Sequence, residues 1–321
     1  MKTWCVSVLA AATLVVFCCG AAFGEEVSDE SPAYLFSHFR GNGEDGLHLA
    51  YSFDGLKWTA LKGNQSFLTP EVGGKLMRDP SIAQDPNGVF HMVWTTGWWE
   101  KGIGLAHSKD LITWTPQTFL PVMKHEPTAK NCWAPEIFYD PDTATFLICW
   151  ATTIPGRFPA TEDSGDNNHR MYCVETKDFE TYSETRLFYD PGFNVIDTFI
   201  VKDAANNRYA MFLKNETKSP VAEKNLRVAF AEKAAGPYGP ASEPITGDYW
   251  AEGPAAMKLG EQWVVYFDKY TQGRYGAAAS PDMKTWEDIS ETVQFPRGTR
   301  HGTCFTVSAS VVEKLMAVKA E

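Results

Sequence analysis

The sequence predicts an all-β protein, a five-bladed β-propeller closed by strands from both termini. A turn motif with an aromatic anchor recurs along the chain, clearly in "SFDGLKWT", "SKDLITWT" and "SPDMKTWED" and more weakly in "TKDFETYS" and "EKAAGPYGP". A second series of polar residues, each heading an apolar run, alternates with the first. No window shows a sustained apolar period of 3.6 with caps, so helices are not expected. Repeats of ~40–50 residues with four strands each are typical of propeller blades.

The N-terminal segment, residues 1–24, is predicted to be a secretory signal peptide. Lys2 precedes a long apolar run, and small residues lie near Ala22 and Gly24. A membrane anchor is the alternative, because the run approaches the ~17–20 residues needed to span a bilayer. "VFCCG" also weakly resembles a lipoprotein cleavage site. The mature protein is therefore expected to be secreted or periplasmic, with a disordered start over residues 25–32.

Residues 33–312 are predicted to form the propeller. The residues that head the innermost strands are Asp79, Glu136, Asp197, Glu252 and His301. Two further strand-like runs follow each of the first four heads. The second strands are expected at 89–96, 145–153, 208–215 and 262–270, and the third strands at 101–108, 169–176, 225–232 and 274–280. The five aromatic anchors of the outer turns are Trp58, Trp114, Tyr182, Tyr238 and Trp286.

The two ends of this region complete one blade between them. His301 begins a strand that no later blade follows, and "AYLFSHF" near the N-terminus has no polar-headed strand before it. Strands from both termini can therefore share a blade, which removes the open sheet edge. The segment 313–321 is expected to be a short tail, at most a frayed helix.

Composition narrows the class of partner. The chain has 321 residues, a formal net charge of −11 and no basic run, which argues against nucleic acid and anionic membranes as partners. After the leader no stretch is long and apolar enough to span a bilayer. The protein is expected to be a monomer. Four cysteines lie outside the leader without the spacing of a metal site, so buried free thiols are favoured and one disulfide stays open: Cys132, Cys149, Cys173 and Cys304.

The five polar heads should converge, because the innermost strands of a propeller run side by side along its axis. Neighbouring carboxylates push each other's pKa values apart, so one can stay protonated as an acid while another is ionised as a base. Glu252 lies between Tyr249–Trp250 and Gly253–Pro254. We therefore expect its pKa to be raised and Glu252 to be the general acid.

The motifs "RDPSI", "WAPEI", "VIDTF", "AEGPAAM" and "RHGT", in this order, resemble those of glycoside hydrolase family 43. The resemblance extends over roughly residues 33–312. The family consists of five-bladed propellers that hydrolyse mainly α-L-arabinofuranosides and β-xylosides with inversion, and some members cleave β-1,3-galactans. Two positions depart from the family pattern: Ile-Asp-Thr replaces Ile-Asp-Pro around Asp197, and Glu136 replaces a more usual Asp.

The resemblance implies a role for each matching residue. Asp79 would be the general base, Asp197 would orient the acid and tune its pKa, and Glu252 would be the general acid. Trp133 would line the sugar pocket, and His301 would lie near the pocket floor or a central ion or water. Inverting hydrolysis needs the two catalytic carboxyl groups ~6.5–9.5 Å apart, so that a water fits between them and the sugar. No cofactor is required; a structural ion or water on the axis is possible.

Further residues are candidates for sugar binding. Trp98 or its neighbour Trp99 could stack on a sugar ring or simply pack between blades. Arg40 and Arg78 could donate hydrogen bonds to sugar hydroxyls, and Arg40 is the better candidate because it precedes a turn at the expected rim. Glu136 either binds sugar hydroxyls or caps a backbone amide, and His301 is otherwise a core histidine.

These features predict an exported glycosidase that acts on side-chain sugars of plant or algal polysaccharides. The main alternative is a carbohydrate-binding propeller without catalytic activity. A fructan-type retaining hydrolase also has an Arg-Asp-Pro motif. It is disfavoured because the chain has no Trp-Met-Asn-Asp-Pro stretch.

Overall fold

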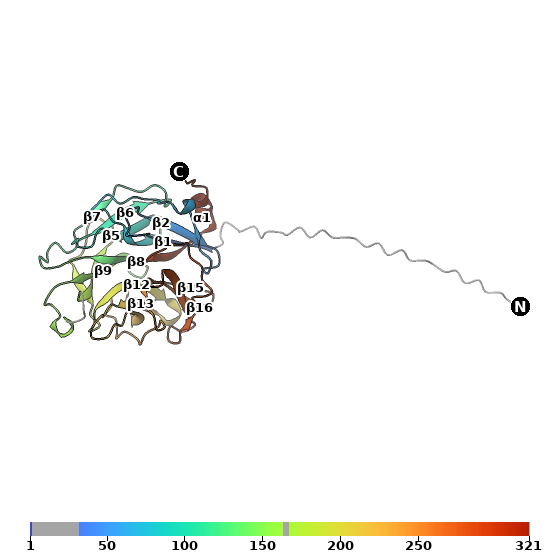
Figure 1. Ribbon diagram of the computed structural model, residues 1–321. Coiled ribbons are helices and arrows are strands. Elements are labelled where there is room, and N and C mark those ends of the chain that lie inside the picture. Colours follow the sequence, from blue (N-terminus) through green and yellow to red (C-terminus); the bar gives the residue numbers. More distant parts are fainter. Residues whose placement is uncertain (2–31, 163–166, 321) are drawn as a thin grey trace.

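The structure is a computed structural model that describes residue 1 and residues 32–162 and 167–320 (Figure 1). The expected signal peptide, apart from its first residue, and the expected disordered segment up to residue 31 lie outside the described residues. Within the described part of the chain, no helix has both the length and the apolar character to cross a bilayer.

Five antiparallel sheets make up the described part of the chain, and the innermost strand of each lies in a closed ring. These strands are β4 (Arg78–Gln84), β8 (Trp133–Asp140), β12 (Val195–Asp203), β15 (Glu252–Leu259) and β19 (Gly302–Ser308). Each contacts the next in this order, and β19 contacts β4. Figure 1 shows these sheets arranged around a common centre. The predicted five-bladed propeller is confirmed.

Four of these sheets follow one another along the chain. In order, they are β4 (Arg78–Gln84), β5 (Phe90–Thr95), β6 (Ile103–Ser108) and β7 (Thr118–Leu120); β8 (Trp133–Asp140), β9 (Thr145–Thr153), β10 (His169–Thr176) and β11 (Arg186–Tyr189); β12 (Val195–Asp203), β13 (Arg208–Asn215) and β14 (Asn225–Ala231); and β15 (Glu252–Leu259), β16 (Gln262–Lys269), β17 (Arg274–Ser280) and β18 (Glu287–Asp288). Single 3-10 turns cover Lys62–Asn64, Pro159–Thr161 and Ala204–Asn206.

The fifth sheet joins the two termini, as predicted. Its order is β19 (Gly302–Ser308), β1 (Pro32–His38), β2 (His48–Ser52) and β3 (Thr59–Ala60). β1 and β19 pair antiparallel, with Phe36 opposite Cys304. Helix α1 (Ala309–Met316) continues directly from β19 and buries Val312 and Leu315 against this blade. The expected boundary at residue 312 therefore falls inside a packed helix.

The third sheet has three strands where four were expected. The segment around Tyr238 still follows β14 through backbone hydrogen bonds, from the Gly239 N–H to the Phe230 carbonyl and from the Ile245 N–H to the Leu226 carbonyl. It does not form a ladder because the prolines in "GPYGPASEP" lack the N–H that a continuous ladder needs.

The recurrent turns in the outer part of the blades share one hydrogen-bond pattern. Asp54, Asp110, Asp178 and Asp282 each accept hydrogen bonds from the backbone N–H groups two and three residues further on, at 2.7–2.9 Å. An aspartate that satisfies its own turn explains why this residue recurs in the motif.

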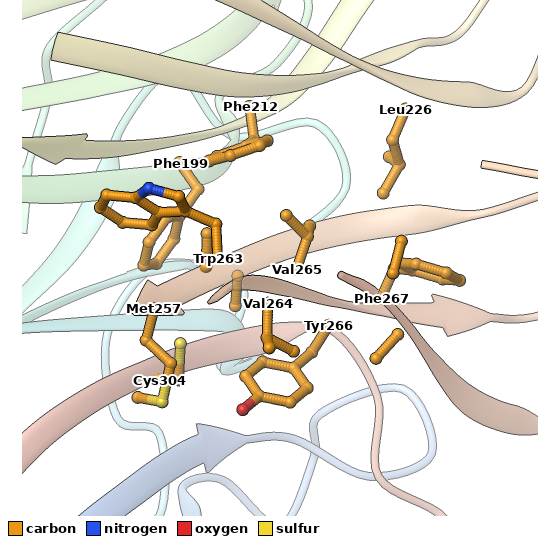
Figure 2. Close-up of a cluster of buried hydrophobic side chains, with 14 of the residues drawn as sticks. Phe199, Phe212, Leu226, Met257, Trp263, Val264, Val265, Tyr266, Phe267 and Cys304 are labelled. Atoms are coloured by element: carbon orange, nitrogen blue, oxygen red, sulfur yellow. The ribbon is translucent and has the colours of Figure 1, made fainter. Parts of the chain in front are cut away.

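Apolar side chains fill the space between blades. Figure 2 shows one such cluster, in which Phe199 and Phe212 of the third sheet meet Trp263 of the fourth. Cys304 of the fifth sheet belongs to the same cluster, near Met257, and all four predicted cysteines are buried free thiols. The expectation of free thiols is confirmed.

Candidate active site

The innermost strands of four blades share a local irregularity at the same end. The pairing register of β4, β8, β12 and β15 shifts just after the first or second residue, as in a β-bulge. The residue at the shift has a left-handed backbone, with φ of 52° at Asp79, 46° at Ala134, 54° at Asp197 and 61° at Gly253. Such strain is typical of functional sites, and aspartate tolerates it better than most residues.

A cavity of about 510 Å³ opens at this end of the propeller axis. Of the residues predicted for the site, it is lined by Arg78, Asp79, Trp98, Trp133, Asp197, Glu252 and His301. The structure therefore brings the three predicted catalytic residues and four predicted binding residues to one place. Arg40 and Glu136 are not among its lining residues.

Asp79 is positioned as an ionised carboxylate. It is buried, accepts a hydrogen bond from the Thr95 hydroxyl at 2.8 Å, and lies 3.4 Å from Nδ1 of His301. Burial acts to raise the pKa of Asp79, but the His301 imidazole and Arg78 outweigh it and hold the pKa at about 2. A carboxylate that stays ionised at neutral pH suits a general base.

Asp197 lies between His301 and strand β15, which bears Glu252. Its Oδ2 accepts a hydrogen bond of 3.0 Å from the backbone N–H of Gly253, and its Oδ1 lies 3.9 Å from Nδ1 of His301. Burial raises the pKa of Asp197 to about 6. The contact with Gly253 fixes the backbone next to Glu252, which fits the orienting role that the resemblance implied.

Glu252 has a different electrostatic setting from the one expected. Its Oε2 lies 3.1 Å from Nζ of Lys214, and its Oε1 lies 3.0 Å from Nη2 of Arg300. Burial acts to raise the pKa of Glu252, but the two cations outweigh it and the pKa is lowered. The expectation of a raised pKa is wrong, because the sequence gives no sign that two distant cations meet this carboxyl group.

His301 stands between the two aspartates. Burial acts to lower its pKa, but Asp197 and Asp79 raise the pKa to about 9. The side chain is therefore an imidazolium at neutral pH, and it lines the cavity. Its position beside both carboxylates distinguishes it from an apolar core histidine.

Glu136 lies deeper along the axis than predicted. The structure aligns Ala134, not Glu136, with Asp79, so Glu136 occupies the position of Ser81. Two residues along a strand is about 6.6 Å. Glu136 is 4% exposed, accepts a 2.7 Å hydrogen bond from the Ser81 hydroxyl, and burial raises its pKa to about 8. Of its two predicted roles, the sugar contact gains no support, because Glu136 is not among the residues that line the cavity.

Arg40 also lies outside the cavity. Its Nη1 donates to the carbonyl of Asn64 at 3.4 Å, on the side of the fifth blade. Arg78 takes the place expected of it, with its guanidinium 4.4 Å from the centre of the Trp98 ring. Trp133 donates from Nε1 to the Trp98 carbonyl at 2.8 Å, so the two tryptophans are held edge to face at the cavity mouth.

No cluster of three or more potential ligands among the described His, Cys, Asp and Glu residues is arranged to hold a metal ion. The possible axial ion therefore has no ligand set of that kind in this part of the chain.

Sequence reasoning missed several cavity residues. Lys214 is 2% exposed and also contacts Glu216 at 2.6 Å, and Arg300 pairs with Asp268 at 2.6 Å. Lys214 directly follows the apolar run "YAMFL" within a strand-like segment, which is a usable sign of a buried charge. Arg300 directly precedes His301 in "TRHGT". The remaining missed lining residues are Thr95, Ala134, Asn167, His169, Asn194, Ile196, Glu216 and Tyr270.

Comparisons with known proteins agree with this geometry. A family model related to glycoside hydrolase family 43, described as "Probable glycosyl hydrolase domain", matches residues 29–313. No curated protein sequence matches the chain.

Solved structures share the fold at low identity. A thermostable family-43 glycoside hydrolase is 13% identical with a TM-score of 0.56, covering 73% of this chain and 80% of its own. An α-L-arabinofuranosidase from Lactobacillus brevis is 17% identical, with a TM-score of 0.50 and coverage of 66% and 72%. A xylan β-1,4-xylosidase from Bacillus halodurans C-125 is 19% identical, with a TM-score of 0.51; the match covers 68% of this chain but only 42% of the xylosidase.

The match of the family model over nearly the whole propeller decides the classification. The chain belongs to the glycosyl hydrolases related to glycoside hydrolase family 43, and it is a glycosidase.

Proposed function

We propose that the protein is an exported, inverting glycosidase that removes a terminal sugar from the side chains of plant or algal polysaccharides. The observation that supports this best is the placement of Asp79 and Glu252. Asp79 on β4 and Glu252 on β15 line the same cavity, and these two strands are not neighbours in the ring. An inverting reaction needs two carboxyl groups that act from opposite sides of the sugar.

Asp79 would take a proton from the attacking water, since its pKa of about 2 keeps it ionised. Glu252 would protonate the departing oxygen and must therefore carry a proton when substrate is bound. Its lowered pKa means that the protonated fraction grows as the pH falls. We therefore expect kcat/KM to rise towards acidic pH and to fall again only as Asp79 becomes protonated.

The sugar is an α-L-arabinofuranoside or β-xyloside in the first instance, with a β-galactoside as a further candidate. The arabinofuranosidase and the xylosidase that share the fold support the first two. The cavity volume of about 510 Å³ lies within the ~300–1,000 Å³ range of small-molecule sites and fits a terminal residue better than an extended chain.

A panel of nitrophenyl glycosides (arabinofuranoside, xyloside, galactoside and fucoside) tests this function. Wild-type protein should release nitrophenol from at least one of them. Glu252→Gln should abolish turnover of that substrate while retaining sugar binding in calorimetry. Unchanged turnover in Glu252→Gln would contradict the role of this residue.

The alternative is a sugar-binding propeller without catalysis. One observation favours it: Glu252 forms ion pairs with Lys214 and Arg300, and a binding site has no need of a protonated acid. Binding of a terminal sugar with no release of nitrophenol at any pH between 4 and 8 would support this alternative.

Export and a monomeric state are also proposals. The apolar run after Lys2 supports cleavage near residue 24 and a secreted or periplasmic location. Mass spectrometry of the mature N-terminus would test cleavage and would detect a lipid on Cys18 or Cys19, and analytical ultracentrifugation would test the oligomeric state.

A further inference from the structure

Arg78 differs from the other cations that line the cavity. Lys214, Arg300 and His301 each lie within 4 Å of two carboxylate groups. Among the described residues, no carboxylate lies within ion-pair distance of Arg78. Among the described cations of the cavity lining, Arg78 is therefore the one whose positive charge no adjacent anion neutralises.

The guanidinium of Arg78 is nevertheless held in place. It lies 4.6 Å from the centre of the Phe39 ring and 4.4 Å from that of Trp98. Its Nη1 donates to Oδ1 of Asn42 at 3.1 Å, and the same oxygen accepts from Nε1 of Trp98 at 3.2 Å. A planar cation fixed by stacking and one hydrogen bond loses little further freedom when it binds a ligand.

Two donor nitrogens of Arg78 remain for such a ligand. Nε and Nη2 make no hydrogen bond to the described residues, and neither is among the buried unpartnered atoms. Hydrogen bonds lower the pKa of Glu44 and of Asp79, and the positive charge of Arg78 lowers both pKa values further. Neither carboxylate lies within ion-pair distance of Arg78. The free edge of the guanidinium is thus open to the cavity mouth.

Aromatic surface surrounds this edge. Trp98 is 43% exposed and Trp99 is 64% exposed, and both contact the ring of Trp133 at the cavity lining. Exposed tryptophans at a sugar-binding cavity offer faces on which the C–H side of a sugar ring can stack. The mouth therefore combines a stacking surface with a positive charge.

We propose that the cavity mouth binds a sugar that bears an anionic substituent, next to the glycosidic bond that is cleaved. The sugar ring would stack on Trp98 or Trp99, and Nε and Nη2 of Arg78 would donate to the carboxylate of a uronic acid or to a sulfate ester. This inference rests on the proposed function, because it places the acidic sugar on the same substrate. A guanidinium fork matches both anions through paired hydrogen bonds.

The net charge of −11 does not oppose this site. Charges more than ~8 Å apart are largely screened at physiological ionic strength, so the local charge of Arg78 decides the contact. The preference for an acidic sugar should accordingly weaken as salt is added.

Calorimetry with monosaccharide probes tests the proposal. D-galacturonate, D-glucuronate and D-galactose 6-sulfate should each be compared with neutral D-galactose and D-glucose. Hydrogen bonds to charged groups predict that at least one acidic sugar binds about 10- to 100-fold more tightly than its neutral counterpart. A preference for the uronates or for the sulfate identifies the anion, and equal binding of acidic and neutral sugars would overturn the proposal.

A pair of variants assigns the preference to Arg78. Arg78→Gln should remove the difference in affinity between acidic and neutral sugars. Arg274→Gln removes an exposed arginine that pairs with Glu291 and does not line the cavity, and it should keep the preference. Retention of the preference in a folded Arg78→Gln variant, checked by circular dichroism, would refute the assignment.

The outcome is separable from that of the proposed function. Wild-type protein that hydrolyses a nitrophenyl glycoside but shows no acidic preference refutes only this inference. Protein that prefers acidic sugars but hydrolyses no glycoside refutes only the catalytic role.

Discussion

Replacing Lys214 with methionine should raise the pKa of Glu252 and move the basic limb of the kcat/KM profile to higher pH. Nζ of Lys214 lies 3.1 Å from Oε2 of Glu252. At an effective dielectric constant near 20, this separation corresponds to a Coulomb attraction of about 5 kcal/mol, before burial opposes it. Loss of one adjacent cation typically raises a carboxyl pKa by about 1–3 units, or about 1–4 kcal/mol. Arg300 stays at 3.0 Å and limits the change.

The assay is the pH dependence of kcat/KM on the best nitrophenyl glycoside, from pH 3 to pH 9. Lys224→Met is a matched control, because Lys224 is a buried lysine that pairs with Glu216 and has no ion pair with Glu252. The control should leave the basic limb within about 0.5 unit, an allowance smaller than the 1–3 units expected at Lys214. A basic limb that does not move in a folded Lys214→Met variant would refute Glu252 as the group that must be protonated.

Three further predictions concern His301, Gly253 and Glu136. His301 has a pKa of about 9 in the fold against 6.5 unfolded, so it stabilises the protein fully below pH 6.5 and loses this contribution as the pH rises through 9. The contribution is up to about 3 kcal/mol, and His301→Gln should flatten urea-unfolding stability between pH 6.5 and 9. In Gly253→Ala the new Cβ would lie 2.4 Å from Cγ of His301, at a backbone φ of +61°. Thermal unfolding should therefore show a loss of stability of more than about 1–2 kcal/mol, and unchanged stability would contradict the bulge geometry at Gly253. Glu136→Gln should leave kcat/KM within about threefold of wild type, a change of less than about 1 kcal/mol in activation free energy, because Glu136 does not reach the cavity. A large rise in KM would instead support a sugar contact for Glu136.

Much of the fold was predictable because each blade repeats the same local chemistry. The turn aspartates, such as Asp54 and Asp282, satisfy their own backbone, and this leaves a visible motif in the sequence. The strand runs are apolar because both faces of a blade pack on neighbouring blades. The third blade was expected to have a fourth strand because its aromatic anchor, Tyr238, is present. The prolines on either side of Tyr238 interrupt the hydrogen-bond ladder, so this strand does not form.

The cavity lining was predictable where the residue belongs to a strand-leading motif, as for Asp79 and Asp197. Glu136 was misplaced because motif alignment does not show where a bulge inserts its residue, and an error of two positions moves a side chain about 6.6 Å along the axis. Lys214 and Arg300 were missed because their contact with Glu252 exists only after blades distant in sequence come together.

Product stereochemistry tests most directly whether Asp79 and Glu252 act from opposite sides of the sugar. Proton NMR of the first minutes of hydrolysis distinguishes the anomers before they equilibrate in water. The arrangement of base and acid predicts that the first product has the inverted configuration. First formation of the retained anomer would contradict it, because that outcome requires a nucleophilic carboxylate bonded to the sugar in place of an activated water.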